Sequence, residues 1–174
     1  MLILRQASVR DLELLQAWDE EPHVNKSDPN DDWNWETELS KAHSWRELLI
    51  AEADGVPMGF IQIINPAQEE TQYWGEIAEG YRAIDIWIGP PGYLGKGYGT
   101  AMMQQALQRC FKHPDVMAVL IDPLVSNIRA CRFYERLGFQ YVEDRTFGED
   151  DCRVYRFLRT DWEARSMAGW KPGN

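Results

Sequence analysis

A glycine-rich segment in the middle of the chain constrains the fold more than any other feature. Residues 94–100 read Leu-Gly-Lys-Gly-Tyr-Gly-Thr, and they lie between an apolar, strand-like run at 84–88 and a helix-like run at 101–111. Glycines at alternate positions leave main-chain N–H groups accessible where the helix begins, and the helix dipole adds positive potential there. The pattern predicts a strand, a loop and a helix that bind the diphosphate of a cofactor. The alternative is a helix start with flexible turn residues.

Two common phosphate-binding motifs are excluded. A P-loop requires glycine, four further residues and then Gly-Lys-Ser/Thr, but Pro90 stands five positions before Gly95, and Gly97 follows Lys96. The dinucleotide-binding fingerprint requires a third glycine three residues after the second, where Thr100 stands. The cofactor is therefore of another kind.

Length and composition indicate one globular domain. The chain has 174 residues, of which 44% are apolar and 12% aromatic, so it can bury a sizeable core. No apolar stretch approaches the roughly 18 residues of a membrane span, and the first residues do not resemble a signal peptide. We therefore expect a cytoplasmic protein without membrane contacts. Three histidines without ligand spacing predict no metal site, and three widely spaced cysteines predict reduced, mostly buried thiols: Cys110, Cys131 and Cys152.

The charge balance narrows the choice of partners. The net charge is −10, and the lysines and arginines form no basic stripe, which argues against a nucleic-acid partner. An anionic cofactor then needs local positive charge, for which Lys96 and Arg129 are candidates. The remaining negative field suits a cationic second substrate, although many acidic proteins carry such charge only for solubility.

The hydrophobic periodicity predicts a mixed α/β fold with helices packed on both faces of the sheet. We expect a single domain over residues 1–164 and a tail over 165–174. Segments 19–34 and 65–81 are acidic and irregular, and they are interpreted as loops. The expected strands are 3–7, 45–53, 56–64, 82–89, 116–121, 139–143 and 152–158. One helix is expected to begin at Ser8, and three others are expected to cover 35–41, 101–111 and 127–137.

A second motif supports the first. Residues 127–139 read Asn-Ile-Arg-Ala-Cys-Arg-Phe-Tyr-Glu-Arg-Leu-Gly-Phe. They resemble the Asn-x-x-Ala-x-x-x-Tyr-x-x-x-Gly-Phe helix of the GCN5-related N-acetyltransferase (GNAT) superfamily. The glycine segment resembles that family's Gln/Arg-x-x-Gly-x-Gly/Ala loop, with Leu94 standing at the Gln/Arg position. The resemblance implies the GNAT fold, with a mixed, mostly antiparallel sheet, and acetyl-CoA as co-substrate. It also implies a pantetheine contact for Asn127 and a position near the sulfur for Tyr134. The alternatives are a helix cap for Asn127 and a core position for Tyr134.

Within the superfamily the chain looks most similar to the aminoglycoside 6′-N-acetyltransferases. The likeness rests on Ile84-Asp85, on the leucine at the start of the glycine loop, on Asp122-Pro123 and on the tryptophan-bearing acidic stretch before Asp85. It implies a cationic small-molecule amine as acceptor, namely the 6′-amine of an aminoglycoside, and direct acetyl transfer in a ternary complex. For the assembly we expect a monomer or a homodimer.

Direct transfer needs a base, a donor for the developing oxyanion and an acid, but no enzyme nucleophile. Asp85 is the expected base, because a carboxylate inside an apolar strand must face a cavity or a partner; the alternative is an ion pair with Arg82 or another cation. Tyr134 is expected to protonate the departing sulfur. The residues expected to bind the cofactor are Trp87, Ile88, Leu94, Gly95, Lys96, Gly97, Tyr98, Gly99, Thr100, Asn127 and Tyr134.

The acceptor is expected to contact Asp85, Asp122, Trp74 and Glu79. A turn before Pro123 is an equally good interpretation of Asp122. Glu79 fits solvated surface charge, and Trp74 fits packing. Two other functions remain open: a GNAT acyltransferase for another amine, such as a polyamine, a siderophore precursor or a protein N-terminus, and a non-catalytic coenzyme A-binding module.

Overall fold

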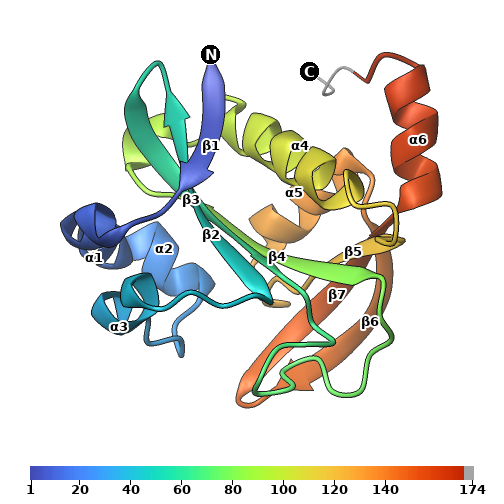
Figure 1. Ribbon diagram of the computed structural model, residues 1–174, viewed down its shortest axis with the longest axis horizontal. Coiled ribbons are helices and arrows are strands. Elements are labelled where there is room, and N and C mark those ends of the chain that lie inside the picture. Colours follow the sequence, from blue (N-terminus) through green and yellow to red (C-terminus); the bar gives the residue numbers. More distant parts are fainter. Residues whose placement is uncertain (171–174) are drawn as a thin grey trace. The chain divides into compact units, whose positions relative to one another are not determined.

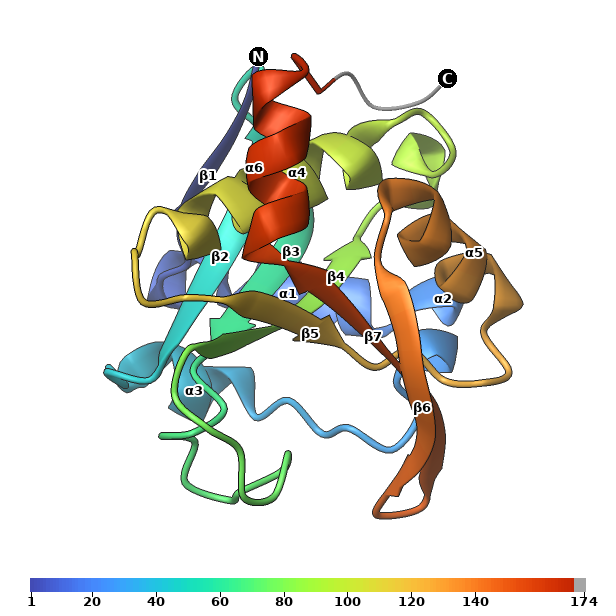
Figure 2. The ribbon, with the colours of Figure 1, turned by 90° about the vertical axis from the view of Figure 1, so that its right-hand side faces the viewer.

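The computed structural model describes residues 1–170, and within them the strands form one seven-stranded mixed sheet in the order β1-β2-β3-β4-β5-β7-β6 (Figures 1 and 2). The expected mixed sheet is thus confirmed. The strands are β1 (Leu2–Gln6), β2 (Arg46–Ala53), β3 (Val56–Ile64), β4 (Tyr81–Ile88), β5 (Ala118–Ile121), β6 (Gln140–Phe147) and β7 (Asp150–Leu158). The helices are α1 (Leu12–Asp19), α2 (Pro22–Ser27), α3 (Trp35–Ser40), α4 (Tyr98–Phe111), α5 (Ile128–Leu137) and α6 (Arg159–Met167).

The chain divides into two compact units. The first comprises residues 1–63 and 85–106, and the second comprises residues 64–84 and the chain from residue 107 onward. Strand β4 contributes its first half to the second unit and its second half to the first.

The first unit has helices on both faces of its part of the sheet. Alternate residues of a strand point to opposite faces, and on one face Ile50 of β2 and Phe60 of β3 pack with Trp18 and Trp35 of α1 and α3. On the opposite face a Cβ atom at Gly59 would lie 2.5 Å from Cε of Met102, so α4 packs there. Burying side chains of this size stabilises the fold by about 1.5–3 kcal/mol each.

A capping box fixes the start of the first helical segment. The hydroxyl of Ser8 accepts a hydrogen bond from the N–H of Arg10 at 3.4 Å, and the carboxylate of Asp11 accepts one from the N–H of Ser8 at 2.8 Å. Arg5 on β1 holds this carboxylate through two further bonds, and its charge and hydrogen bonds keep the pKa of Asp11 below the usual value despite burial. The predicted helix start at Ser8 is confirmed.

One prediction about this unit is wrong. Residues 22–27, interpreted as loop, form helix α2. Pro22 occupies its first turn, where the missing N–H costs no hydrogen bond, and Val24 is buried. The acidic and polar composition of the segment hides this short helix, because only one of its six side chains enters the core.

The second unit is a parallel pair followed by antiparallel ones. Strand β4 pairs with β5 in parallel, β5 with β7 antiparallel, and β7 with β6 antiparallel. Val154 points to a cluster that includes Trp74 and Phe147. On the opposite face, Tyr155 donates a hydrogen bond to Glu135 of α5, and the Arg165 guanidinium of α6 lies 5.5 Å from the ring of Phe157. Helices therefore cover one face here, and the 65–80 segment contributes to the other.

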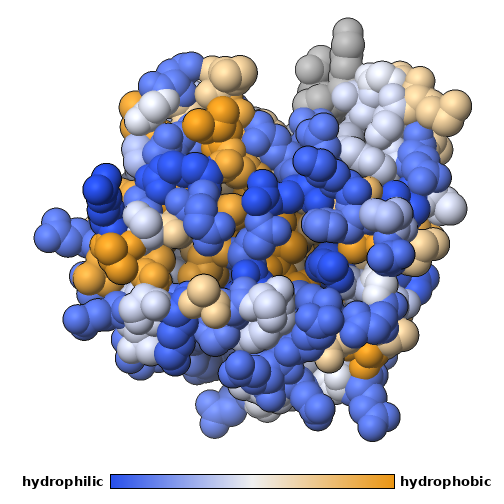
Figure 3. Space-filling model, viewed as in Figure 1, coloured by the Kyte–Doolittle hydropathy of each residue, from blue (hydrophilic) through white to orange (hydrophobic). Residues whose placement is uncertain are grey.

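The C-terminal helix α6 extends past residue 164. It runs to Met167, so the segment predicted as a tail begins inside it, and residues 171–174 lie outside the described part of the chain. Hydrophilic side chains predominate on the face in Figure 3, in keeping with the net charge of −10. None of the helices in residues 1–170 has the length and apolar character needed to cross a membrane.

Candidate active site

The glycine loop has the predicted form. After β4 a short turn over Pro91–Tyr93 leads into the loop, and α4 begins at Tyr98, three residues earlier than expected. Gly95 and Gly97 have φ of 73° and 85°, a region that disfavours side chains. A Cβ atom at Gly97 would meet nothing within 4 Å, so the backbone conformation rather than packing requires glycine there.

The first turn of α4 presents main-chain donors. The first bond of the helix runs from the N–H of Ala101 to the carbonyl oxygen of Gly97, at 3.2 Å. The N–H groups of residues 98–100 precede it and have no partner within the helix. Lys96 is exposed beside them. A loop with glycine at alternate positions, N–H groups without partners in the helix and the ammonium group of Lys96 form a cradle that fits a diphosphate.

Asp85 is partly buried on β4 and bonds to a neutral amide. Its Oδ2 accepts a hydrogen bond from Nε2 of Gln62 on β3, at 2.7 Å. Loss of hydration raises the pKa of Asp85 to about 6; the Gln62 bond opposes this shift and the negative charge of Asp31 adds to it. Arg82, the cation considered as a partner, instead donates to the carbonyl oxygen of Tyr81. At neutral pH Asp85 is therefore an ionised carboxylate with a pKa suited to general-base catalysis.

Aromatic rings account for this desolvation. Trp87 lies two residues after Asp85 and Phe60 two residues before Gln62, so each shares a strand face with its polar neighbour. The Phe60 and Trp87 ring centroids are 4.5 Å apart, and Trp33 packs edge-on against both. The carboxylate thus shares its face of the sheet with packed aromatic rings, which is consistent with its loss of hydration.

A further carboxylate contacts Trp35, whose ring stacks on Trp33 with centroids 4.6 Å apart. Asp19 accepts a hydrogen bond from the indole N–H of Trp35 at 2.5 Å. Burial raises the pKa of Asp19, and the charges of Asp31 and Asp32 add to the effect. This part of the first unit therefore carries a negative potential, which favours a cationic ligand.

The second unit holds the motif of α5. The side chain of Asn127 accepts a hydrogen bond from the N–H of Ala130 at 3.1 Å, so it caps the helix as the alternative interpretation expected. Tyr134 is 7% exposed, and its ring packs against Phe139 and Tyr155. Gly138 ends α5 with φ of 98°.

The predicted acceptor residues of the second unit differ in exposure. Asp122 is partly buried and accepts a hydrogen bond from the hydroxyl of Tyr73 at 2.6 Å. Trp74 is 5% exposed and packs edge-on against Phe147, whereas Glu79 is exposed. Packing thus accounts for most of the Trp74 ring surface.

The first unit brings together Asp85, Trp87, Ile88 and the loop at 94–100, and the second holds the other predicted site residues. Sequence reasoning missed Gln62. Its signal was the same as for Asp85, a polar side chain inside an apolar strand. In residues 1–170 no three His, Cys, Asp or Glu side chains are grouped as a metal site would require, and all three cysteines are buried and free of disulfides.

Sequence comparisons identify relatives of this chain. A family model described as an acetyltransferase (GNAT) domain matches residues 8–147. Aminoglycoside N(6′)-acetyltransferase type 1 of Klebsiella pneumoniae is 35% identical over 92 residues, which is 52% of this chain and 46% of that protein. A kanamycin resistance protein of Rhizobium radiobacter is 37% identical over 73 residues, 41% of this chain and 68% of that protein. The match with the Klebsiella enzyme thus spans about half of that relative's length.

Solved structures share the fold over most of the chain. Aminoglycoside acetyltransferase AAC(6′)-Ib in complex with coenzyme A and kanamycin has a TM-score of 0.86 at 26% identity, covering 95% of this chain and 99% of that one. An uncharacterized protein of Bacillus halodurans has a TM-score of 0.86 at 21% identity, and the match covers 97% of this chain and 89% of that one. At this identity the likeness is one of fold alone.

Proposed function

Because the chain belongs to the acetyltransferase (GNAT) domain family, we propose that it transfers the acetyl group of acetyl-CoA directly to a primary amine of a cationic small molecule. The favoured acceptor is the 6′-amine of an aminoglycoside. The relatives named for that reaction, and the related structure that contains coenzyme A and kanamycin, support this choice.

One observation carries the proposal. Strand β4 holds a carboxylate whose pKa is raised to about 6, and the same strand leads into a glycine-rich loop and the first turn of a long helix. A proton acceptor and a diphosphate cradle thus belong to one continuous segment of the first unit. Acetyl transfer to an amine requires both.

The cradle residues fit coenzyme A. When bound, acetyl-CoA supplies the thioester whose carbonyl carbon the amine attacks and whose C–S bond then breaks. The N–H groups of residues 95–100 and the ammonium group of Lys96 would hold its diphosphate, and Asn127 would contact the pantetheine arm. Main-chain N–H groups around Trp87 and Ile88 would donate to the thioester oxygen.

Asp85 and Tyr134 would move the protons. The Asp85 carboxylate orients the ammonium group of the acceptor and takes a proton from it, directly or through one water, so that the neutral nitrogen has a lone pair with which to attack the thioester. The Tyr134 hydroxyl gives a proton to the departing sulfur. The second proton, which the nitrogen loses after the C–N bond has formed, replaces the one that Tyr134 gives away. Neither step needs a nucleophile of the protein.

Carboxylates and an aromatic ring would select the acceptor. Asp122 and Glu79 would bind further ammonium groups, and Trp74 would contact the acceptor's ring system. Charge-assisted contacts of this kind contribute roughly 1.5–3 kcal/mol each. The negative potential around Asp19 and Asp31 in the first unit favours the same class of ligand.

The test measures release of free coenzyme A with acetyl-CoA and a panel of amines. The panel contains kanamycin, spermidine, a hydroxylamine-bearing diamine and a peptide with a free N-terminus. We expect turnover of kanamycin, and a loss of tenfold or more in kcat for Asp85→Asn with acetyl-CoA affinity retained. Turnover of another amine alone would refute the aminoglycoside assignment. Binding of acetyl-CoA without turnover of any amine would favour a coenzyme A-binding module.

A further inference from the structure

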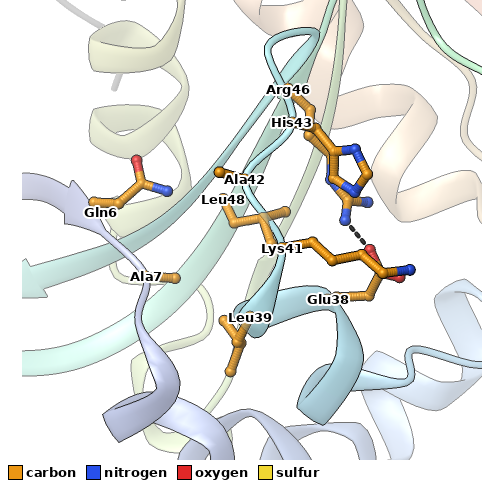
Figure 4. A pocket seen from close by; sticks show the side chains of 9 residues that line it. All are labelled: Gln6, Ala7, Glu38, Leu39, Lys41, Ala42, His43, Arg46 and Leu48. Atoms are coloured by element: carbon orange, nitrogen blue, oxygen red, sulfur yellow. Dashed lines mark ion pairs between the residues drawn. The ribbon is translucent and has the colours of Figure 1, made fainter.

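The hydrogen-bond partner of Asp85 is itself held in place by an arginine. Gln62 is 5% exposed; its Nε2 donates to Asp85, and its Oε1 accepts a bond from Nη1 of Arg46 on β2 at 3.3 Å. The Arg46 guanidinium forms an ion pair with Glu38 of α3 at the wall of a pocket of about 190 Å³ (Figure 4). A continuous chain of polar contacts within the first unit thus runs from Glu38 to Asp85.

The chemistry of the end groups fixes the orientation of the Gln62 amide. A guanidinium can only donate hydrogen bonds, and an ionised carboxylate can only accept them. The amide oxygen must therefore face Arg46, and the NH₂ group must face Asp85. In this orientation Gln62 can stabilise the charged carboxylate but cannot accept a hydrogen bond from a protonated one.

The contact with Arg46 keeps the Gln62 amide in the orientation that favours the ionised form of Asp85. If Arg46 did not hold the amide oxygen of Gln62, the Gln62 amide could turn over and accept a hydrogen bond from neutral Asp85. The Arg46 side chain is 9% exposed, and both Glu38 and the Trp45 ring, 5.0 Å away, limit its movement. The guanidinium is therefore well fixed on the oxygen side of Gln62.

We propose that Gln62 and Arg46 are positioning residues that keep Asp85 in its ionised, proton-accepting form. The role of Asp85 as a proton acceptor rests on the proposed function, whereas the hydrogen bonds from Arg46 through Gln62 to Asp85 do not depend on it. Other charged or titratable groups bear on Asp85, on Arg46 or on the strand that holds Asp85. Asp31 acts against ionisation of Asp85, Glu38 holds Arg46, and the His23 ring lies 2.7 Å from the Ile88 carbonyl oxygen on the same strand as Asp85.

The deciding experiment measures the titration of Asp85 in the free protein by carboxyl ¹³C NMR, with the signal assigned through Asp85→Asn. Gln62→Met keeps the side-chain length and removes the donor. We expect the midpoint to rise by about one pH unit, because a hydrogen bond to a charged group is lost. Arg46→Met should raise it by a smaller amount, since the amide remains but can turn over.

A matched control removes the same charge elsewhere in the pocket. Lys41 is exposed and lines the pocket without contacting Gln62 in the described structure, so Lys41→Met should leave the midpoint nearly unchanged. In the Gln62→Met background, Arg46→Met should add no more shift than Lys41→Met does. A larger additional shift would show that Arg46 acts through its charge alone and would refute its positioning role.

The two proposals can fail separately. An unchanged midpoint in both Gln62→Met and Arg46→Met would overturn the positioning role, whatever the enzyme acetylates. If Gln62→Met does not fold, Arg46→Met decides alone, and an unchanged midpoint overturns the proposal. Shifted midpoints without acetylation of any amine would reject the proposed function and leave the positioning role standing. If both proposals hold, the acidic limb of the pH profile of kcat/KM should move to higher pH in these variants, by the same amount as the NMR midpoint.

Discussion

The Asp85→Asn variant should be more stable than the unmodified chain, and the gain should depend on pH. Folding raises the pKa of Asp85 from 3.8 to about 6, mainly because the carboxylate loses hydration. Between these two values the folded state binds more protons than the unfolded state, so stability falls as pH rises through this window. Above pH 6 the full cost of holding the charge is present. Asparagine removes the charge and can still accept the hydrogen bond from Gln62.

The size of the gain follows from the shift. A difference of about 2.2 pKa units corresponds to about 3 kcal/mol at pH 8. At pH 5, where the unfolded carboxylate is mostly ionised and the folded one mostly protonated, the same linkage gives about half of that free energy. The difference in unfolding free energy between variant and unmodified chain should therefore fall by roughly half between pH 8 and pH 5.

Urea unfolding followed by tryptophan fluorescence measures this difference, since the chain has eight tryptophans. The exposed Glu143 on β6 offers a matched control, and Glu143→Gln should change stability little at any pH. If Asp85→Asn raised the unfolding free energy equally at pH 5 and pH 8, or lowered it at both, the conclusion that folding desolvates this carboxylate would be refuted.

Three further changes test other parts of the proposal. Gly97→Val should abolish acetyl-CoA binding in calorimetry, because valine is strained at φ of 85° and would cover the cradle; Gly148→Val, at φ of 59° in the open β6–β7 turn, carries similar strain and should bind normally. Tyr134→Phe should slow the acetyl step by tenfold or more in single-turnover assays, and an unchanged rate would leave the tyrosine a packing role only. Asn127→Ala should cost about 1 kcal/mol of stability by removing the α5 cap. Asn127→Ser should restore the cap, so an acetyl-CoA affinity that stays low in this variant would reveal a separate pantetheine contact.

The parts of the site that local sequence determines could be predicted. The strand at 84–88, the glycine loop and the following helix were all recognised, because alternating glycines and an aspartate inside an apolar strand leave a local signal. The Ser8 cap and the end of α5 at Gly138 were recognised for the same reason.

Features that depend on strand pairing could not be predicted. Gln62 and Asp85 are 23 residues apart, and only the register of β3 against β4 makes them neighbours. The contact of Arg46 with Gln62 depends in the same way on the pairing of β2 with β3. The burial of Trp74 is a tertiary effect as well, because it depends on Phe147 at the end of a distant strand. Helix α2 was missed because so few of its side chains are apolar.

The absence of a side chain at Gly59 lets strand β3 lie close to the Trp87 carbonyl oxygen of β4 and to the Met102 side chain of α4. An added methyl group would meet Cε of Met102 at 2.5 Å and the Trp87 carbonyl oxygen at 2.7 Å. The end of the Met102 side chain can turn aside, but the Trp87 carbonyl oxygen belongs to the main chain, so β3 and β4 would have to separate to admit the methyl group. Trp87 and Ile88 would then move with β4, and their N–H groups are the proposed donors to the thioester oxygen. A search for variants that alter cofactor affinity should thus include residue 59, although it has no functional group to lose.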